Sequence, residues 1–66
     1  MEIVINGMAH EVPDDMSLER AVSLISRSAT GIAAAVNDDV VRRASWPQTR
    51  LRPGDRVEVV TAVQGG

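Results

Sequence analysis

The chain has 66 residues, a net charge of −2, 44% apolar residues and no cysteine. This length predicts one small domain over residues 1–66, and the lack of cysteine excludes disulfides, thiolate metal sites and cysteine nucleophiles. His10 is the only histidine and Trp46 the only aromatic residue. A histidine metal cage or catalytic triad is therefore not expected, and the core has to be mainly aliphatic.

The first twelve residues have the pattern of a β-hairpin. Residues 2–6 are rich in β-branched side chains, residues 8–12 alternate partially, and Asn6-Gly7 stands between them. Asn-Gly is the strongest short signal for a two-residue hairpin turn, because both residues tolerate a positive φ. Alternation assigns two faces, with Met1, Ile3 and Ile5 on one and Val4 on the other.

One amphipathic helix is predicted after a connector at residues 13–16. Ser17 has the side chain of an N-cap, and Thr30-Gly31 is expected to end the helix or to follow its end. One apolar stripe recurs at helical spacing: Leu18, Ala21, Val22 and Ile25. We expect Leu18, Val22 and Ile25 to pack against Ile3, Ile5, Val57 and Val59.

The second half of the chain has the pattern of three further strands. Residues 32–36 and 40–42 are predicted to pair around a turn at 37–39, and residues 45–48 are predicted to be irregular. Pro53-Gly54 fits the centre of a type II turn that leads into a last strand over residues 57–63. The fold class is therefore α+β, with one helix covering one face of a sheet of four to five strands.

No constellation of catalytic side chains is present in the sequence. The glycines form no phosphate-binding motif, and the acidic pairs Asp14-Asp15 and Asp38-Asp39 are interpreted as solvated turn or cap residues. His10 is interpreted as a surface histidine, and no metal site is predicted. The start of the chain lacks a signal-peptide pattern and no apolar run is long enough to span a membrane, so a cytoplasmic location is expected.

The arginines are distributed unevenly. Five of them fall within fifteen residues, namely Arg42, Arg43, Arg50, Arg52 and Arg56. A solvated face and a docking surface for an acidic partner are both compatible with this cluster. Nucleic-acid binding is not expected, because no exposed aromatic residues accompany the arginines for base stacking.

The Gly65-Gly66 ending is the most informative feature of the chain. Two residues without Cβ atoms can enter a narrow channel and leave the α-carboxylate sterically free. Such a carboxylate becomes an electrophile once an activating enzyme converts it to an acyl adenylate. Chemistry carried by the terminus needs no reactive side chain, which fits this composition.

Several motifs together resemble the ThiS family of thiamine-biosynthesis sulfur carriers, within the ubiquitin-like β-grasp group. The resemblance spans the whole chain. Its motifs are Met1 to Gly7, the helix start Ser17-Leu18-x-x-Ala21-Val22, Val36 to Val41, Arg43 with Trp46, Leu51-x-x-Gly54-Asp55-x-Val57-Glu58, and Gly65-Gly66. Two residues depart from it: Arg42 stands where proline is common, and Gln64 where a small residue is frequent.

The resemblance implies a β-grasp sheet with the first and last strands side by side, and a role as a protein co-substrate rather than an enzyme. It implies that a ThiF-like enzyme adenylates Gly66 with ATP and magnesium, which that partner binds. Sulfur from a cysteine desulfurase route then gives a Gly66 thiocarboxylate, which supplies thiazole formation on a ThiG-like synthase. The chain itself is expected to bind no cofactor.

Two further site predictions concern the partners. Residues 63–66 (Val63, Gln64, Gly65 and Gly66) are expected to form a flexible tail that reaches into a buried site. Val4, Val60 and Ala62 are expected on the sheet face away from the helix as an apolar docking patch, with Arg42 and Arg43 as further contacts.

Three other functions remain open from the residues alone. The small subunit of molybdopterin synthase is also a β-grasp protein ending in Gly-Gly, although it is usually longer and richer in phenylalanine. A ubiquitin-like modifier joined to lysines of target proteins and a plain interaction module are the other two.

Overall fold

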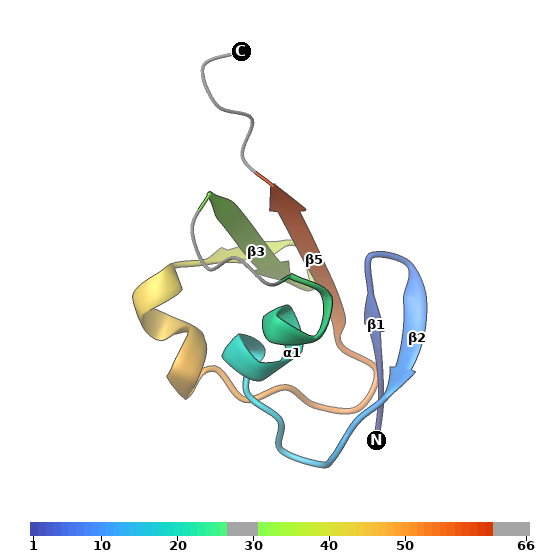
Figure 1. Ribbon diagram of the computed structural model, residues 1–66. Helices are drawn as coiled ribbons and strands as arrows, with labels where there is room; N and C mark the ends of the chain where they lie inside the picture. Colours follow the sequence, from blue (N-terminus) through green and yellow to red (C-terminus); the bar gives the residue numbers. More distant parts are fainter. Residues whose placement is uncertain (27–30, 62–66) are drawn as a thin grey trace.

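The computed structural model describes residues 1–26 and 31–61 and contains a five-stranded sheet, one α-helix and one 3-10 helix. The elements in chain order are β1 (Glu2–Ile5), β2 (Met8–Glu11), α1 (Leu18–Ile25), β3 (Ile32–Val36), β4 (Asp39–Val41), η1 (Arg43–Gln48) and β5 (Arg56–Thr61). The strand order across the sheet is β2-β1-β5-β3-β4, and α1 lies across one face of this sheet (Figure 1). The predicted α+β arrangement is confirmed.

The sheet is mixed because its first and last strands run parallel at its centre. β1 pairs with β5 in parallel, with Val4 opposite Arg56, and each of these strands has an antiparallel neighbour on its other side. The β1–β2 hairpin turns at Asn6 (φ 50°) and Gly7 (φ 82°), which are the two positive φ values of the predicted turn. The side-by-side placement of the first and last strands is therefore confirmed.

Two turns of the second half set the register of β3, β4 and β5. Asn37 (φ 50°) and Asp38 (φ 74°) form the turn between β3 and β4, while Asp39 already pairs with Val36 in the ladder. The predicted turn at 37–39 was thus one residue too long, and the strand predicted at 40–42 begins and ends one residue earlier, at Asp39–Val41. Before β5, Gly54 has φ 84° and the Asp55 N–H donates to the Arg52 carbonyl, which confirms the type II turn.

The helix α1 begins as predicted but buries a shorter stripe. The Ser17 Oγ accepts a hydrogen bond from the Arg20 backbone N–H at 3.2 Å, which makes Ser17 the N-cap. Leu18, Ala21 and Val22 are buried, whereas Ile25 is 41% exposed, so its predicted core position is wrong. Ile25 is the last residue of α1.

The core lies between α1 and the sheet. Its buried members are Ile3, Ile5, Val12, Leu18, Ala21, Val22, Ala34, Trp46, Leu51 and Val57. The predicted contribution of Ile3, Ile5 and Val57 is confirmed, and Val59 is half-buried against the same cluster. In the part of the chain that the structure describes, no helix has the length and apolar character needed to cross a membrane.

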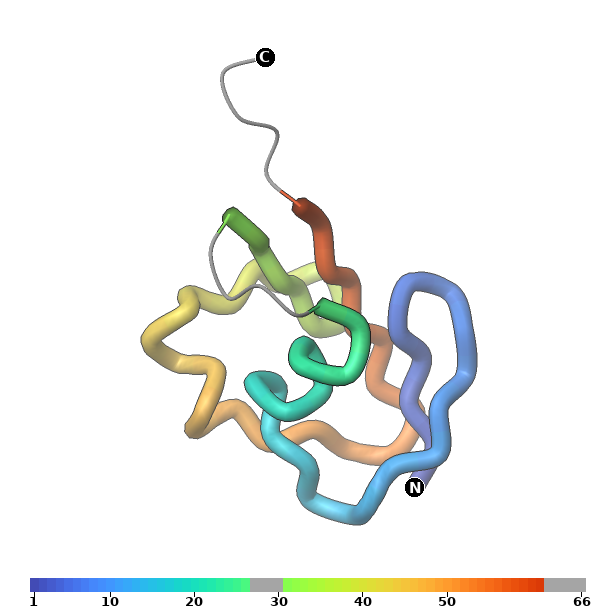
Figure 2. Tube along the Cα trace, viewed as in Figure 1, coloured from blue at the N-terminus to red at the C-terminus, as the bar shows by residue number. Residues whose placement is uncertain are grey.

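The segment between β4 and β5 closes one side of the core, and the tube in Figure 2 shows it passing around α1. Residues 45–48, predicted as irregular, belong to the 3-10 helix η1. Trp46 on η1 is only 4% exposed, and its indole Nε1 donates to the Val41 carbonyl at 2.9 Å. The guanidinium of Arg43 stands 5.9 Å from the centre of the indole ring. One aromatic side chain thus joins η1 to the end of β4.

Candidate functional site

The candidate site comprises β5 and the face of the sheet that α1 leaves uncovered. Ala62, Val63, Gln64, Gly65 and Gly66 lie outside the described residues, so the predictions for the tail remain predictions. The structure describes the strand that leads into them. Thr61 at the end of β5 pairs with Ile32 of β3, so β5 is held by a neighbouring strand up to its last described residue.

Asn6 fastens β5 on its other side, beyond the end of β1. The Asn6 side-chain oxygen accepts from the Val59 N–H at 2.8 Å, and its amide nitrogen donates to the Val59 carbonyl at 3.2 Å. These two bonds to the Val59 backbone take the place of the backbone hydrogen bonds that a longer β1 would make with β5. The strand that carries the chain toward its Gly-Gly end is therefore fixed to the body of the protein on both sides.

The face of the sheet opposite α1, called the open face below, presents a shallow apolar hollow. Strand pairing places Val60 beside Ala33, Glu58 beside Ala35, and Ala35 beside Val40, so these side chains share one face. The hollow has a volume of about 210 Å³ and is lined by Ala33, Ala34, Ala35, Val40, Glu58 and Val60. Val60 is 59% exposed and Val40 is 78% exposed.

The structure describes two of the three residues predicted for the docking patch, and their role in docking stays a prediction. Val60 lines the hollow. Val4 does not: it is half-buried on β1, and its neighbour across the strands is Arg56 of β5. Ala62 falls outside the described residues. The apolar neighbours of Val60 come instead from β3 and β4, because β3 pairs with β5 from Val57 to Thr61, whereas β1 pairs only with Arg56 and Val57.

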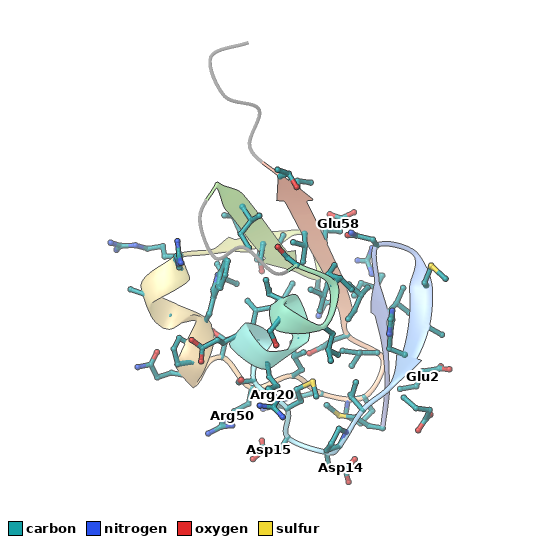
Figure 3. The ribbon with its side chains drawn as sticks, in the orientation of Figure 1. Glu2, Asp14, Asp15, Arg20, Arg50 and Glu58 are labelled. Carbon is teal, nitrogen blue, oxygen red and sulfur yellow. The ribbon has the colours of Figure 1, made fainter. Side chains whose placement is uncertain are left out.

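The arginine cluster does not form one surface. Arg56 lies on the open face and its Nη2 pairs with the Asp38 carboxylate at 3.2 Å, while Arg50 donates to the Asp15 carbonyl at 3.3 Å near the start of α1. Arg43 stacks on Trp46, and Arg42 is the exposed residue just before η1. Figure 3 shows Arg50 and Arg20 together at the end of the molecule near Asp15, away from Glu58. The contact role predicted for Arg42 and Arg43 remains a prediction.

Residues 1–26 and 31–61 contain no cluster of side chains that would form a metal site. No group of three His, Asp or Glu side chains is placed to hold a metal ion there. His10, predicted as a surface histidine, lies on β2 opposite Ile3 and is half-buried. Among the described residues, the open face with its hollow is the feature best suited to recognition by a partner.

The family comparison decides what kind of protein carries this surface. The model of the ThiS family matches residues 2–66. The chain belongs to the ThiS family. The Escherichia coli sulfur carrier protein ThiS is 24% identical over 66 residues, and the match covers all of both chains.

Two other relatives of this ThiS-family chain extend the comparison. The crystal structure of the thiamine biosynthesis protein ThiS from Geobacter metallireducens superposes with a TM-score of 0.86 at 25% identity, covering all of both chains, which confirms the β-grasp fold. A thiazole synthase from Paramagnetospirillum magneticum is 27% identical over 66 residues. The chain spans all of its own length in that match but only 20% of the thiazole synthase.

Sequence reasoning missed Ala33, Ala35 and Val40 as members of the surface. The signal that could have found them was the two-residue alternation of residues 32–36, which places Ala33 and Ala35 on one face of a strand. The register that sets these alanines beside Glu58 and Val60 is a long-range pairing. Local patterns do not specify such a pairing.

Proposed function

We propose that this chain carries sulfur as a thiocarboxylate on Gly66 and delivers it for thiazole formation in thiamine biosynthesis. Membership of the ThiS family supports this proposal, and it is the observation that carries it. The end-to-end match with the Escherichia coli sulfur carrier ThiS includes the Gly65-Gly66 ending. Of the carrier pathways compatible with the sequence, these relatives favour thiamine biosynthesis over molybdopterin synthesis.

The proposed chemistry takes place on the α-carboxylate of Gly66. A carboxylate oxygen attacks the α-phosphorus of ATP, and pyrophosphate leaves, giving an acyl adenylate. The terminal sulfur of a persulfide, which the cysteine desulfurase route supplies, then attacks the carbonyl carbon, and a thiol afterwards cleaves the S–S bond of the resulting acyl disulfide by disulfide exchange. The new C–S bond replaces the C–O bond to AMP, which leaves, and Gly66 becomes a thiocarboxylate.

The chain acts in this scheme as a co-substrate, and its partners supply the catalytic groups. A ThiF-like adenylating enzyme supplies the site for ATP and magnesium, and we propose that the reaction takes place in the cytoplasm. A ThiG-like thiazole synthase accepts the sulfur. The Paramagnetospirillum magneticum relative supports this second partner, because a segment similar to the whole chain is part of a thiazole synthase there.

The hollow on the open face is proposed as the docking site of the adenylating enzyme. Val60 lines the hollow on β5, the same strand that continues toward Gly66. An enzyme docked on the hollow would therefore contact the strand that precedes the reactive end of the chain. From Thr61, the five residues 62–66 can extend at most about 17 Å, so the reactive carboxylate has to enter a site within this distance of β5.

Replacing Val60 with aspartate is expected to weaken binding to the adenylating enzyme at least about tenfold, about 1.4 kcal/mol, because a carboxylate would be buried in an apolar contact. The fold should persist, since Val60 is 59% exposed. Leu24→Asp is the matched control, because Leu24 is 51% exposed on α1, on the other side of the sheet. Titration calorimetry measures both affinities, and an unchanged affinity for the folded Val60→Asp protein would remove this docking site.

Reconstitution with the adenylating enzyme of the same organism tests the proposed function directly. We expect ATP–pyrophosphate exchange that depends on the chain, followed by thiocarboxylate formation when a cysteine desulfurase and cysteine are added. Covalent attachment of the chain to lysines of other proteins, without thiocarboxylate, would instead identify a ubiquitin-like modifier.

A further inference from the structure

Among the residues that the structure describes, Glu58 is the one charged residue that lines the hollow. It lies on β5 between Arg56 and Val60 on the open face, and its cross-strand neighbour is Ala35. The nearest candidate cation on its own strand is already engaged, because Arg56 pairs with Asp38 at 3.2 Å. Within residues 1–26 and 31–61, no arginine forms an ion pair with Glu58.

This position has different consequences in the free protein and in a complex. In the free protein the Glu58 side chain is exposed, and water solvates its charge. A partner seated on Ala33, Ala35 and Val60 would remove that water, and an ionised carboxylate buried without a counter-charge is strongly destabilising. An apolar partner surface would therefore bind this hollow poorly, whereas a surface with a cation aimed at Glu58 would bind it well.

We infer that the enzyme that docks on the open face inserts one arginine or lysine side chain into the hollow, where its charge pairs with Glu58. This inference rests on the proposed docking site. The aliphatic stem of such a side chain covers the apolar lining, and its charged head reaches the carboxylate. Among ubiquitin-like sheet faces in the same cell, this one charge inside an apolar hollow then selects the partner that carries the matching cation.

Replacing Glu58 with glutamine tests the inference, because it removes the charge and keeps the shape. The affinity for the adenylating enzyme is expected to fall about tenfold at low ionic strength, and the loss should shrink as salt is added. Glu58→Arg is expected to lower it about a hundredfold. The matched control is Glu2→Gln, which makes the same change of net charge on an exposed residue of the open face outside the hollow, and it should change the affinity less than twofold.

A charge exchange identifies the partner residue. Single replacements of surface arginines and lysines of the adenylating enzyme by glutamate should include one that weakens binding of the native chain and restores binding of Glu58→Arg. If Glu58→Gln binds with native affinity and native salt dependence while Val60→Asp binds weakly, the inference is wrong and the docking site stands. If neither variant alters binding, the docking site itself is wrong, although sulfur transfer through Gly66 can still proceed.

Discussion

Deleting Gly66 should abolish thiocarboxylate formation while leaving the folded body and its docking unchanged. The shortened chain ends one residue earlier, so its carboxylate falls about 3.5 Å short of the α-phosphorus of ATP. Nucleophilic attack depends on near-contact geometry, and even a 1 Å misplacement can cost about a hundredfold in rate. Stability should change by less than about 0.5 kcal/mol, because the buried core residues among residues 1–26 and 31–61 lie between Ile3 and Val57.

ATP–pyrophosphate exchange with the adenylating enzyme measures this effect, and titration calorimetry measures docking in parallel. Gly65→Val should also block exchange, because a β-branched side chain adds bulk and restricts φ next to the reacting group. Gln64→Ala is the control within the same segment, and it should retain exchange because it adds no bulk. Normal exchange and normal thiocarboxylate yield after deletion of Gly66 would show that the terminus is not the reacting group.

Replacing Trp46 with alanine should leave the protein largely unfolded in dilute buffer. Large-to-small changes at buried aromatic residues cost about 3–5 kcal/mol. The whole net stability of a domain of this size is of the same order, about 3–5 kcal/mol. Trp46 is 4% exposed, and its indole N–H donates a hydrogen bond to the Val41 carbonyl. The alanine variant loses both the packing and this hydrogen bond.

Urea unfolding followed by far-UV circular dichroism checks this prediction. Trp46→Phe retains an aromatic ring without the indole donor and should cost about 1–3 kcal/mol, which keeps the transition measurable. Val40→Ala is the surface control, because Val40 is 78% exposed, and it should change the free energy of unfolding by less than about 0.5 kcal/mol. A Trp46→Ala protein with a native unfolding midpoint would show that η1 does not close the core.

The elements that were predictable are those whose signals are local. The Asn6-Gly7 turn, the Ser17 cap and the Pro53-Gly54 turn each depend on the backbone preferences of two to four neighbouring residues. The burial of Trp46 on η1 was not predictable in this way. It depends on the packing of η1 against α1, which is distant in sequence, and no periodicity marks a six-residue 3-10 helix.

The candidate site shows the same division. The Gly-Gly ending and the family motifs are read from the sequence itself, and alternation along the last strand placed Val60 on the open face correctly. The hollow around Val60 could not be predicted, because Ala33, Ala35 and Val40 reach it only through the register of three strands. For the same reason, the sequence does not predict that Glu58 lacks an ion pair with the described arginines. The structure shows this, because Arg56 pairs with Asp38 instead.

Intact-protein mass spectrometry of the chain purified from its native host tests the central claim most directly. We expect a population in which one oxygen atom is replaced by sulfur, with the replacement located at Gly66 by fragmentation. This population should disappear when the adenylating enzyme is deleted from the host. A chain that carries only the unmodified carboxylate, under conditions in which the cells make thiamine, would contradict the assignment of sulfur transport to Gly66.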